Sequence, residues 1–252
     1  MSAVRDGVRS AIAALTFLTA VPVGRRAAIA ATDLGRGLVL FPVVGAAVGA
    51  AMGLVVWGTA QVVPPLPAAV LAVAAGVLLT GALHLDGLAD IADGVGAVLS
   101  GRDPTEVMAD PRLGTFGGAA LTLDLLLKAS VFAAFATEAR FPWEAIAAGA
   151  LARMSILGLA VALPYAGPDD GTGAWTARLD RRRCLAAFGI GAAIAVATSG
   201  LTFLPMVAAA GVVCAVVGRW SSRHLDGMRG DTFGAAAELT ETLALTAALA
   251  MP

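Results

Sequence analysis

Three aspartates recur at helical spacing near residue 90 of this 252-residue chain. Asp86, Asp90 and Asp93 are four and then three residues apart within HLDGLADIADG, residues 84–94. On a helix this spacing stacks the carboxylates on one face, about 5–6 Å from neighbour to neighbour. Like charges so close repel unless a cation neutralises them, and carboxylate oxygens suit a hard ion such as Mg²⁺ or Mn²⁺ that shares its shell with substrate phosphate. The pattern therefore predicts a metal site.

Other interpretations of this acidic segment stay open. A solvated helix end has the same pattern, and carboxylates in an apolar chain also mark proton or sodium pathways. Zinc matches poorly, since His84 and His224 are the only histidines and no cysteine accompanies them. Cys184 and Cys214 lack metal-ligand spacing, so we interpret them as small hydrophobic residues.

The next segment, RDPTEVMADPRLGTFGG at residues 102–118, has residue types suited to phosphate. The planar guanidinium of Arg112 matches phosphate oxygens, and the backbone amides of a glycine-rich loop can line a concave anion site. Taken alone, such a loop has a purely structural role as often as a phosphate-binding one. Directly after the acidic row, it is better interpreted as the other wall of a site.

Charged residues also interrupt later apolar stretches. Lys128, the only lysine, lies one turn after Asp124, so it either neutralises that carboxylate or reaches toward a bound phosphate. Arg153 needs a partner or a ligand for the same reason. The segment 223–241 repeats HLDG and contains DTFG as an echo of GTFG, which suggests a second wall of the site.

Membrane helices must position these groups. Only 14% of the residues are charged, against roughly 25% in soluble domains, and the mean hydropathy is +0.84. These values exclude a soluble globular enzyme, and the net charge of −1 gives no reason to expect a nucleic-acid partner. A spanning helix needs about 20 apolar residues. We predict an all-α, polytopic integral membrane bundle of about seven transmembrane helices, at residues 38–63, 66–83, 119–136, 145–163, 185–198, 201–217 and 235–250.

The sidedness of the bundle follows from its arginines. The stretch from Ala11 to Val23 is too short to span and is expected to form an interfacial or re-entrant helix. With a cytoplasmic N-terminus, only Arg140 falls on the external side and nearly all other arginines on the cytoplasmic side, which is the positive-inside pattern. No long polar linker occurs, so a single membrane-embedded domain over residues 1–252 is the simplest organisation.

Several separated motifs resemble one known family, the adenosylcobinamide-GDP ribazoletransferases, also called cobalamin synthases. The resemblance covers nearly the whole chain. Family members often carry arginine where Ala20 and Gly167 stand here, which puts any substrate contact of those arginines in doubt. The motifs are FLTAVPVG (17–24), FPVVGAAVGA (41–50), HLDGLADIADG (84–94), RDPTEVMADPRLGTFGG (102–118) followed by Lys128, and GDTFGAAAELTE (230–241).

The resemblance implies a transferase of the last steps of cobalamin assembly, in the bacterial cytoplasmic (inner) membrane with its active site facing the cytoplasm. Adenosylcobinamide-GDP and α-ribazole, or α-ribazole 5'-phosphate, would give adenosylcobalamin, or its 5'-phosphate, and GMP, with Mg²⁺ or in its place Mn²⁺. A metal and arginines can stabilise the charge that develops on the phosphoryl oxygens. The implied partners are both substrates and the lipid bilayer, and the resemblance leaves open a homo-oligomer or contact with other cobalamin-assembly enzymes.

That reaction divides the candidate residues by role. Asp110 is expected to be a further metal ligand or the general base for the ribazole hydroxyl, and with Asp93 it makes the predicted catalytic pair. The full predicted sets are Asp86, Asp90, Asp93 and Asp110 for the metal; Arg102, Arg112 and Lys128 for the pyrophosphate; and His84, Asp226, Asp231 and Glu238 for metal, ribazole or corrinoid contacts.

Two competing functions belong to other classes. A cation-coupled transporter predicts carboxylates near the membrane midplane and an inverted repeat, whereas the main acidic cluster lies at the cytoplasmic end and the two hydropathy halves do not match. A CDP-alcohol phosphotransferase would release CMP. DIADG resembles the first part of its signature, but the Ala-Arg and later paired aspartates of that signature are absent at the expected spacing.

Overall fold

The structure is a computed structural model that describes residues 2–22, 31–138, 141–169, 171 and 173–250. Within these residues the chain forms helices and no strand; Tyr165 and Met228 make one isolated β-bridge. Arg25, Arg26 and Arg140 lie outside the described residues. The helices are α1 (Ser2–Leu18), α2 (Ala31–Gly37), η1 (Leu38–Leu40), α3 (Phe41–Thr59), α4 (Pro65–Thr80), α5 (Leu83–Leu99), α6 (Pro104–Met108), α7 (Thr115–Thr137), α8 (Trp143–Ala162), η2 (Ala174–Arg178), α9 (Arg181–Ser199), η3 (Gly200–Thr202), α10 (Phe203–His224) and α11 (Gly230–Ala248).

Several of these helices can cross a membrane, which confirms an all-helical, polytopic bundle. Four helical runs are long and apolar enough, and the bent pair of α4 and α5 makes a fifth if it is one span. The predicted count of seven is not confirmed. One reason is that α11 carries Asp231, Glu238 and Glu241, more charge than an ordinary spanning helix. The four runs are Asp33–Thr59, Thr115–Thr137, Trp143–Ala162 and Arg181–His224.

A sharp bend separates the acidic helix α5 from the apolar helix α4 that precedes it. Gly81 and Ala82 both have positive φ, 62° and 59°, and the axes of α4 and α5 differ by 92° at this break. Glycine adopts this left-handed conformation without a steric penalty, which lets the chain turn sharply here. Since α5 begins at Leu83, it still holds all three aspartates on a single helix.

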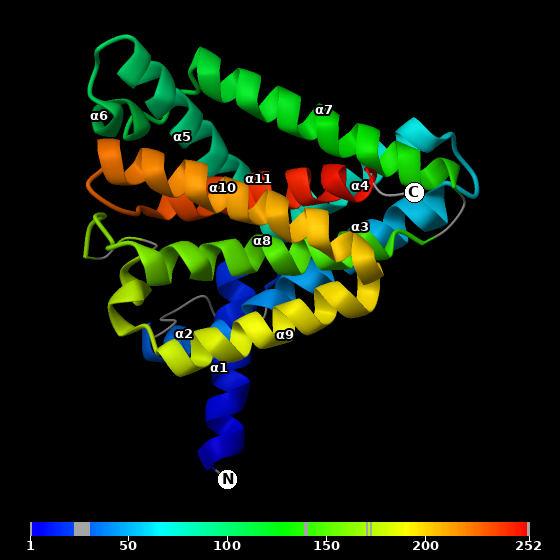
Figure 1. Ribbon diagram of the computed structural model, residues 1–252, viewed down its shortest axis with the longest axis horizontal. Coiled ribbons are helices and arrows are strands. Elements are labelled where there is room, and N and C mark those ends of the chain that lie inside the picture. The colour runs from blue at the N-terminus through cyan, green and yellow to red at the C-terminus, as the bar shows by residue number, and fades with distance from the viewer. Residues whose placement is uncertain (1, 23–30, 139–140, 170, 172, 251–252) are drawn as a thin grey trace.

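Close approach of backbones holds the centre of the bundle together. The helix α8 lies in the middle and packs on α3, α9 and α11 (Figure 1). Gly45 and Gly49 of α3 face Gly149 and Ala145 of α8, and a Cβ on any of the three glycines would collide with a backbone carbonyl of the facing helix. Small residues four apart permit this contact, which matters because lipid gives helices little hydrophobic reason to associate.

The turns that carry Arg102, Asp110, Arg112 and Asp226 of the predicted site lie at one end of the bundle, on the left of Figure 1. They connect α5 to α7, α8 to α9, and α10 to α11. Two of these turns pair directly, since the N–H of Ala166 donates to the carbonyl of Met228 at 2.8 Å and the N–H of Met228 donates to that of Pro164 at 2.8 Å. Of the predicted interfacial segment, residues 11–18 form the end of α1, where Ala13, Ala14 and Leu18 are buried, and residues 19–22 follow this helix without helical structure.

Candidate active site

The row of aspartates on α5 meets a fourth carboxylate from α11. The two helices touch at glycine, where a Cβ on Gly87 would lie 2.7 Å from the carbonyl oxygen of Asp231. The charges of Asp86, Asp93 and Asp231 consequently all act on Asp90, which is half-buried among them. Within the described part of the chain, the side chains of Asp86, Asp90 and Asp231 make no hydrogen bond or salt bridge. These three carboxylates are available to a ligand.

Asp93 differs from its neighbours because both of its oxygens are already bonded. They accept the backbone N–H groups of Gly114 and Gly117, each at 2.8 Å. These donors belong to the start of α7, where the first N–H groups of a helix have no partner of their own and favour negative charge. The glycine-rich loop thus binds an anion, as its composition predicted, but the anion is the carboxylate of Asp93. A Cβ on Gly117 would lie 2.5 Å from that carboxylate, so glycine is needed here.

A cavity of about 820 Å³ opens between α5, α6 and the start of α7. Its charged residues include several that the sequence predicted, and Phe116 forms part of its apolar wall. In the described structure, therefore, the predicted phosphate-binding loop does border a cleft beside the acidic row. The charged lining residues are Asp93, Arg102, Asp103, Glu106, Asp110 and Arg112.

Asp110 and Arg112 form a close ion pair inside this cleft. The guanidinium Nε donates to both oxygens of Asp110, at 2.9 and 3.1 Å, and the backbone N–H of Arg112 donates to Oδ1 at 3.0 Å. These hydrogen bonds lower the pKa of Asp110 to about 2 and raise the pKa of Arg112. A carboxylate with so low a pKa holds protons weakly, so this arrangement is unfavourable for the predicted general-base role.

A second cavity, of about 290 Å³, lies between α1, α5, α8 and α11. Its walls are mainly apolar, and His84, Asp86 and Asp231 contribute its titratable groups. Asp86 borders this cavity and Asp93 the first, about 10 Å apart along α5. The acidic row therefore connects two cavities of different chemical character.

The repeated TFG sequence has the same structural role on both sides of α5. Residues 115–117 begin α7 and residues 232–234 lie in the first turns of α11. In each copy the glycine faces α5 closely, and the phenylalanine, Phe116 or Phe233, lines one of the two cavities. The suggestion that segment 223–241 supplies a second wall agrees with this placement.

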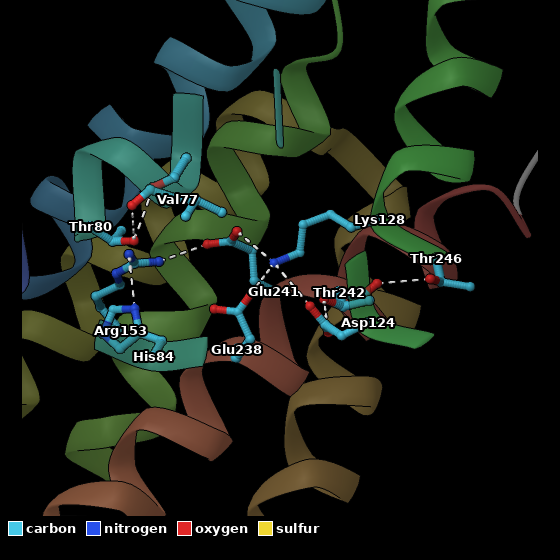
Figure 2. A network of polar contacts seen from close by, with 11 residues as sticks. Val77, Thr80, His84, Asp124, Lys128, Arg153, Glu238, Glu241, Thr242 and Thr246 are labelled. Carbon is cyan, nitrogen blue, oxygen red and sulfur yellow. Dashed lines mark hydrogen bonds and ion pairs between the residues drawn. The ribbon is translucent and has the colours of Figure 1, made fainter. Parts of the chain in front are cut away.

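A buried ionic network joins α7, α8 and α11, and Figure 2 shows how its side chains converge. The Lys128 ammonium forms an ion pair with Glu238 and also lies 3.4 Å from Glu241 Oε1 and 3.6 Å from Asp124 Oδ2. The Thr242 hydroxyl donates to Asp124 Oδ1 at 2.6 Å. Lys128 and Glu238, predicted to contact substrate, therefore point toward each other and do not line the cleft of Arg112.

Arg153 connects this network to the second cavity (Figure 2). Its guanidinium donates to Glu241 Oε2 at 2.7 Å and lies 3.5 Å from Nδ1 of His84, which borders that cavity. The side chain of Arg153 is only 1% exposed, so its charge depends on these partners. The partner that the sequence required for Arg153 is Glu241.

One further residue, Arg229, was not predicted as a site residue. Arg229 precedes α11, its charge acts on both Asp103 and Asp231, and its buried Nε has no hydrogen-bond partner among the described residues. The only sequence signal for it was its place directly before the GDTFG motif. Asp226, which was predicted, lies exposed with φ of 58° in the turn before α11 and lines neither cavity.

Among the described residues, no three His, Cys, Asp or Glu side chains are arranged so that they alone could hold a metal ion. Mg²⁺ seldom has an all-protein cage, because it is usually bound by one or two carboxylates, water and substrate phosphate. Two of the three carboxylates of Asp86, Asp90 and Asp231, whose charges act on one another, would be enough for such a partial shell. Their donor chemistry therefore fits Mg²⁺.

Comparison with known proteins identifies relatives along the whole chain. Residues 10–249 match the family model described as cobalamin-5-phosphate synthase. A protein of Ralstonia nicotianae named adenosylcobinamide-GDP ribazoletransferase is 36% identical over 99% of this chain and 98% of its own length. Proteins with the same name from Pseudomonas paraeruginosa and Escherichia coli strain K12 are 37% and 34% identical, over 96% and 94% of this chain and 98% of each relative. No solved structure matches.

Proposed function

Because this chain belongs to the cobalamin-5-phosphate synthase family, we propose that it transfers the adenosylcobinamide phosphate group of adenosylcobinamide-GDP to α-ribazole or α-ribazole 5'-phosphate. The names of its relatives make the protein a transferase of cobalamin synthesis. The structural observation that supports this reaction best is the row of free carboxylates beside a cleft that contains arginines. Phosphoryl transfer depends on positioning and on charge stabilisation, which such a site provides.

In the proposed reaction the hydroxyl oxygen of ribazole attacks the phosphorus that carries cobinamide. A new P–O bond forms, the bond from that phosphorus to the bridging oxygen breaks, and GMP leaves with the electron pair. Arg102 and Arg112 border the cleft, and Arg229 has an unsatisfied Nε close to the acidic row, so these guanidinium groups are our candidates for the pyrophosphate oxygens. Lys128 is the weaker candidate, since carboxylates surround it.

We propose that Asp86 and Asp90 hold Mg²⁺, for which Mn²⁺ would substitute, because their oxygens have no hydrogen bond or salt bridge in the described structure. A bound divalent ion supplies positive charge that stabilises the phosphoryl oxygens. Asp93 and Asp110 also belong to the predicted ligand set, but their bonds support another role. In our proposal Asp93 positions the glycine-rich loop and Asp110 orients the guanidinium of Arg112.

The hydroxyl proton of ribazole needs an acceptor near the acidic row. Asp231 borders the second cavity, is only partly exposed, and is not engaged by a hydrogen bond or salt bridge among the described residues. We therefore favour Asp231 over Asp110 as the group that accepts the proton, because the strong pairing of Asp110 opposes protonation.

We place the protein in the bacterial cytoplasmic membrane, with this end of the bundle facing the cytoplasm. The support is the arginine distribution of the sequence, together with the gathering of the corresponding turns at one end of the bundle (Figure 1). A site at the membrane surface suits a corrinoid, which is large and amphipathic. A homo-oligomer or contact with other cobalamin-assembly enzymes stays a proposal.

The decisive experiment is turnover by the purified protein in detergent or liposomes. Adenosylcobinamide-GDP, α-ribazole and Mg²⁺ are supplied, and GMP and cobalamin are measured. We expect both products in equal amounts, and no GMP when Mg²⁺ is chelated. Absence of turnover with either α-ribazole or its 5'-phosphate, under conditions where a relative from the family is active, would refute the proposal.

A variant tests the acidic row in the same assay. Asp90→Asn keeps the shape of the side chain but removes its charge, so we expect a loss of turnover of at least about 100-fold with unchanged folding. Asp6→Asn on the exposed part of α1 is the matched control, since its only described salt bridge is to Arg36. Near-normal Mg²⁺-dependent turnover by Asp90→Asn would exclude Asp90 as a ligand.

A further inference from the structure

We propose that the cavity between α1, α5, α8 and α11 binds the flat aromatic base of the acceptor nucleoside, with Thr16 as a hydrogen-bond donor to it. The inference rests on the proposed function and assigns one of its two substrates to one of the two cavities. Thr16, Phe17, Leu83, Ile156 and Phe233 are among the uncharged residues that line it.

Aromatic side chains hold one side of this cavity rigid. The ring of Phe17 stacks on that of Phe41 with centroids 5.8 Å apart and an interplanar angle of 20°. The ring of Trp175 lies 6.3 Å from Phe17 and 5.9 Å from Phe233, so it joins the two phenylalanines that line the cavity. A preformed wall of aromatic rings favours a flat aromatic ligand, because such pairs stabilise beyond the burial of their area.

The Thr16 hydroxyl is the polar group of this wall that lacks a partner. It is buried and has no hydrogen bond among the described residues. The hydroxyls of Ser10 on α1 and of Thr19 just after it donate to backbone carbonyls four residues earlier, at 2.9 and 2.7 Å. A buried hydroxyl without a partner is unfavourable unless a ligand satisfies it. A ring nitrogen with a free lone pair, as in an alkylated imidazole-type base, accepts such a donor.

The charges of the two cavities distinguish the two substrates. No arginine or lysine is among the described residues that line the cavity of Phe17, and its charged groups are the carboxylates of Asp86 and Asp231. A nucleotide pyrophosphate would be repelled there, whereas the cleft beside α6 offers Arg102 and Arg112. The base and ribose of the acceptor carry no charge, so this part of the substrate fits the cavity of Asp86 and Asp231.

This assignment also brings the attacking hydroxyl and the pyrophosphate to the same acidic row. With the base against Phe17 and Phe233, the ribose of the nucleoside extends toward Asp86 and Asp231 at the polar end of the cavity. Carboxylates accept hydrogen bonds from sugar hydroxyls. The attacking hydroxyl then lies beside the acidic row, and the pyrophosphate reaches the same row from the cleft on its other side.

Calorimetric titration of α-ribazole alone into the purified protein in detergent tests this inference without turnover. Thr16→Val keeps the shape of the side chain and removes the donor, so we expect Kd to rise about 5-fold, the worth of one net hydrogen bond. Phe17→Leu keeps an apolar side chain and removes the ring, and we expect Kd to rise about 2- to 10-fold. Thr198→Val on α9 is the matched control, because its hydroxyl bonds only to the Ile194 carbonyl, and we expect the wild-type Kd.

Steady-state turnover separates the inference from the proposed function. In Thr16→Val the KM for α-ribazole should rise while the KM for adenosylcobinamide-GDP stays constant. Wild-type affinity for α-ribazole in both variants, or a rise in KM for the GDP substrate alone, would overturn the assignment even if wild-type turnover is normal. If the two variants bind α-ribazole more weakly, as expected, but the wild-type protein releases no GMP, the assignment of the cavity is supported and the proposed reaction is refuted.

Discussion

Replacement of Lys128 distinguishes a structural from a substrate-binding role for this residue. Its ammonium group is 3% exposed and contacts Glu238, Glu241 and Asp124. The only other cation that these three carboxylates contact in the described structure is Arg153, which donates to Glu241. In Lys128→Met, Glu238 would have no cationic partner left among the described residues and would face two other carboxylates.

The structure sets the size of the expected effect. Removal of one partner from a buried ion pair costs about 3–5 kcal/mol, because the remaining charge is left unpaired in a poorly solvated place. Lys128 contacts three carboxylates, so we expect the upper part of this range for Lys128→Met. For a protein of this size that corresponds to a fall in Tm of about 8–20 °C. The double variant Lys128→Met/Glu238→Gln should recover about 2 kcal/mol, because it removes the unpaired charge as well.

The assay is thermal unfolding in detergent, followed by the loss of helical circular dichroism, with turnover measured on the same samples. Arg36→Met is the control for loss of a cation, since its pair with Asp6 is exposed on both sides and such pairs contribute at most about 1 kcal/mol. A Lys128→Met protein that melts like wild type, with a raised KM for adenosylcobinamide-GDP, would refute the structural argument. That result would support the pyrophosphate contact predicted from the sequence.

Two other perturbations test the contacts around the acidic row. A Cβ at Gly87 would lie 2.7 Å from the Asp231 carbonyl oxygen, so Gly87→Ala should separate α5 from α11, destabilise the protein by about 1–3 kcal/mol and reduce turnover. The same change at Gly58, where a Cβ would have nothing within 4 Å, should be neutral. Equal melting temperatures and equal turnover for the two variants would contradict this expectation. The pKa of Asp110 is lowered by Arg112 to about 2, so the favourable pairing is fully present above the ordinary aspartate pKa and is lost as the pH falls toward 2. When turnover is measured between pH 5 and 9, its decrease at acidic pH should therefore occur at the same pH in wild type and in Arg112→Met. A decrease that occurs at a different pH in this variant would mean that Asp110 titrates between pH 5 and 9.

The features that the sequence predicted well depend on local spacing. Three aspartates four and three residues apart fall on one continuous helix, and Lys128 lies 3.6 Å from Asp124, the carboxylate one turn earlier. Apolar stretches likewise indicate membrane helices, because a helix satisfies its own backbone groups. Such patterns need only the helix period and the composition of the segment, which are present in the sequence itself.

The features that could not be predicted join residues far apart in the chain. Glu238 pairs with Lys128 across 110 residues, and the Gly117 N–H donates to Asp93 across 24. Neither pairing has a spacing signal, since each depends on how α5, α7 and α11 pack. The 92° bend before α5 was also missed, because one glycine in an apolar stretch is common in membrane helices and does not specify a break.

The contrast between paired and free carboxylates indicates where a ligand belongs. Asp93, Asp110 and Glu241 each have close donors, so this fold can supply partners to acidic groups even when they are buried. Asp86 and Asp231 have no such donor in the described structure, although both add their negative charge to that acting on Asp90. That repulsion destabilises the protein on its own, and Arg229, whose charge acts on Asp231, offsets only part of it. Since a bound cation removes the same repulsion, the arrangement is best explained if the missing positive charge arrives with the metal and its phosphate substrate.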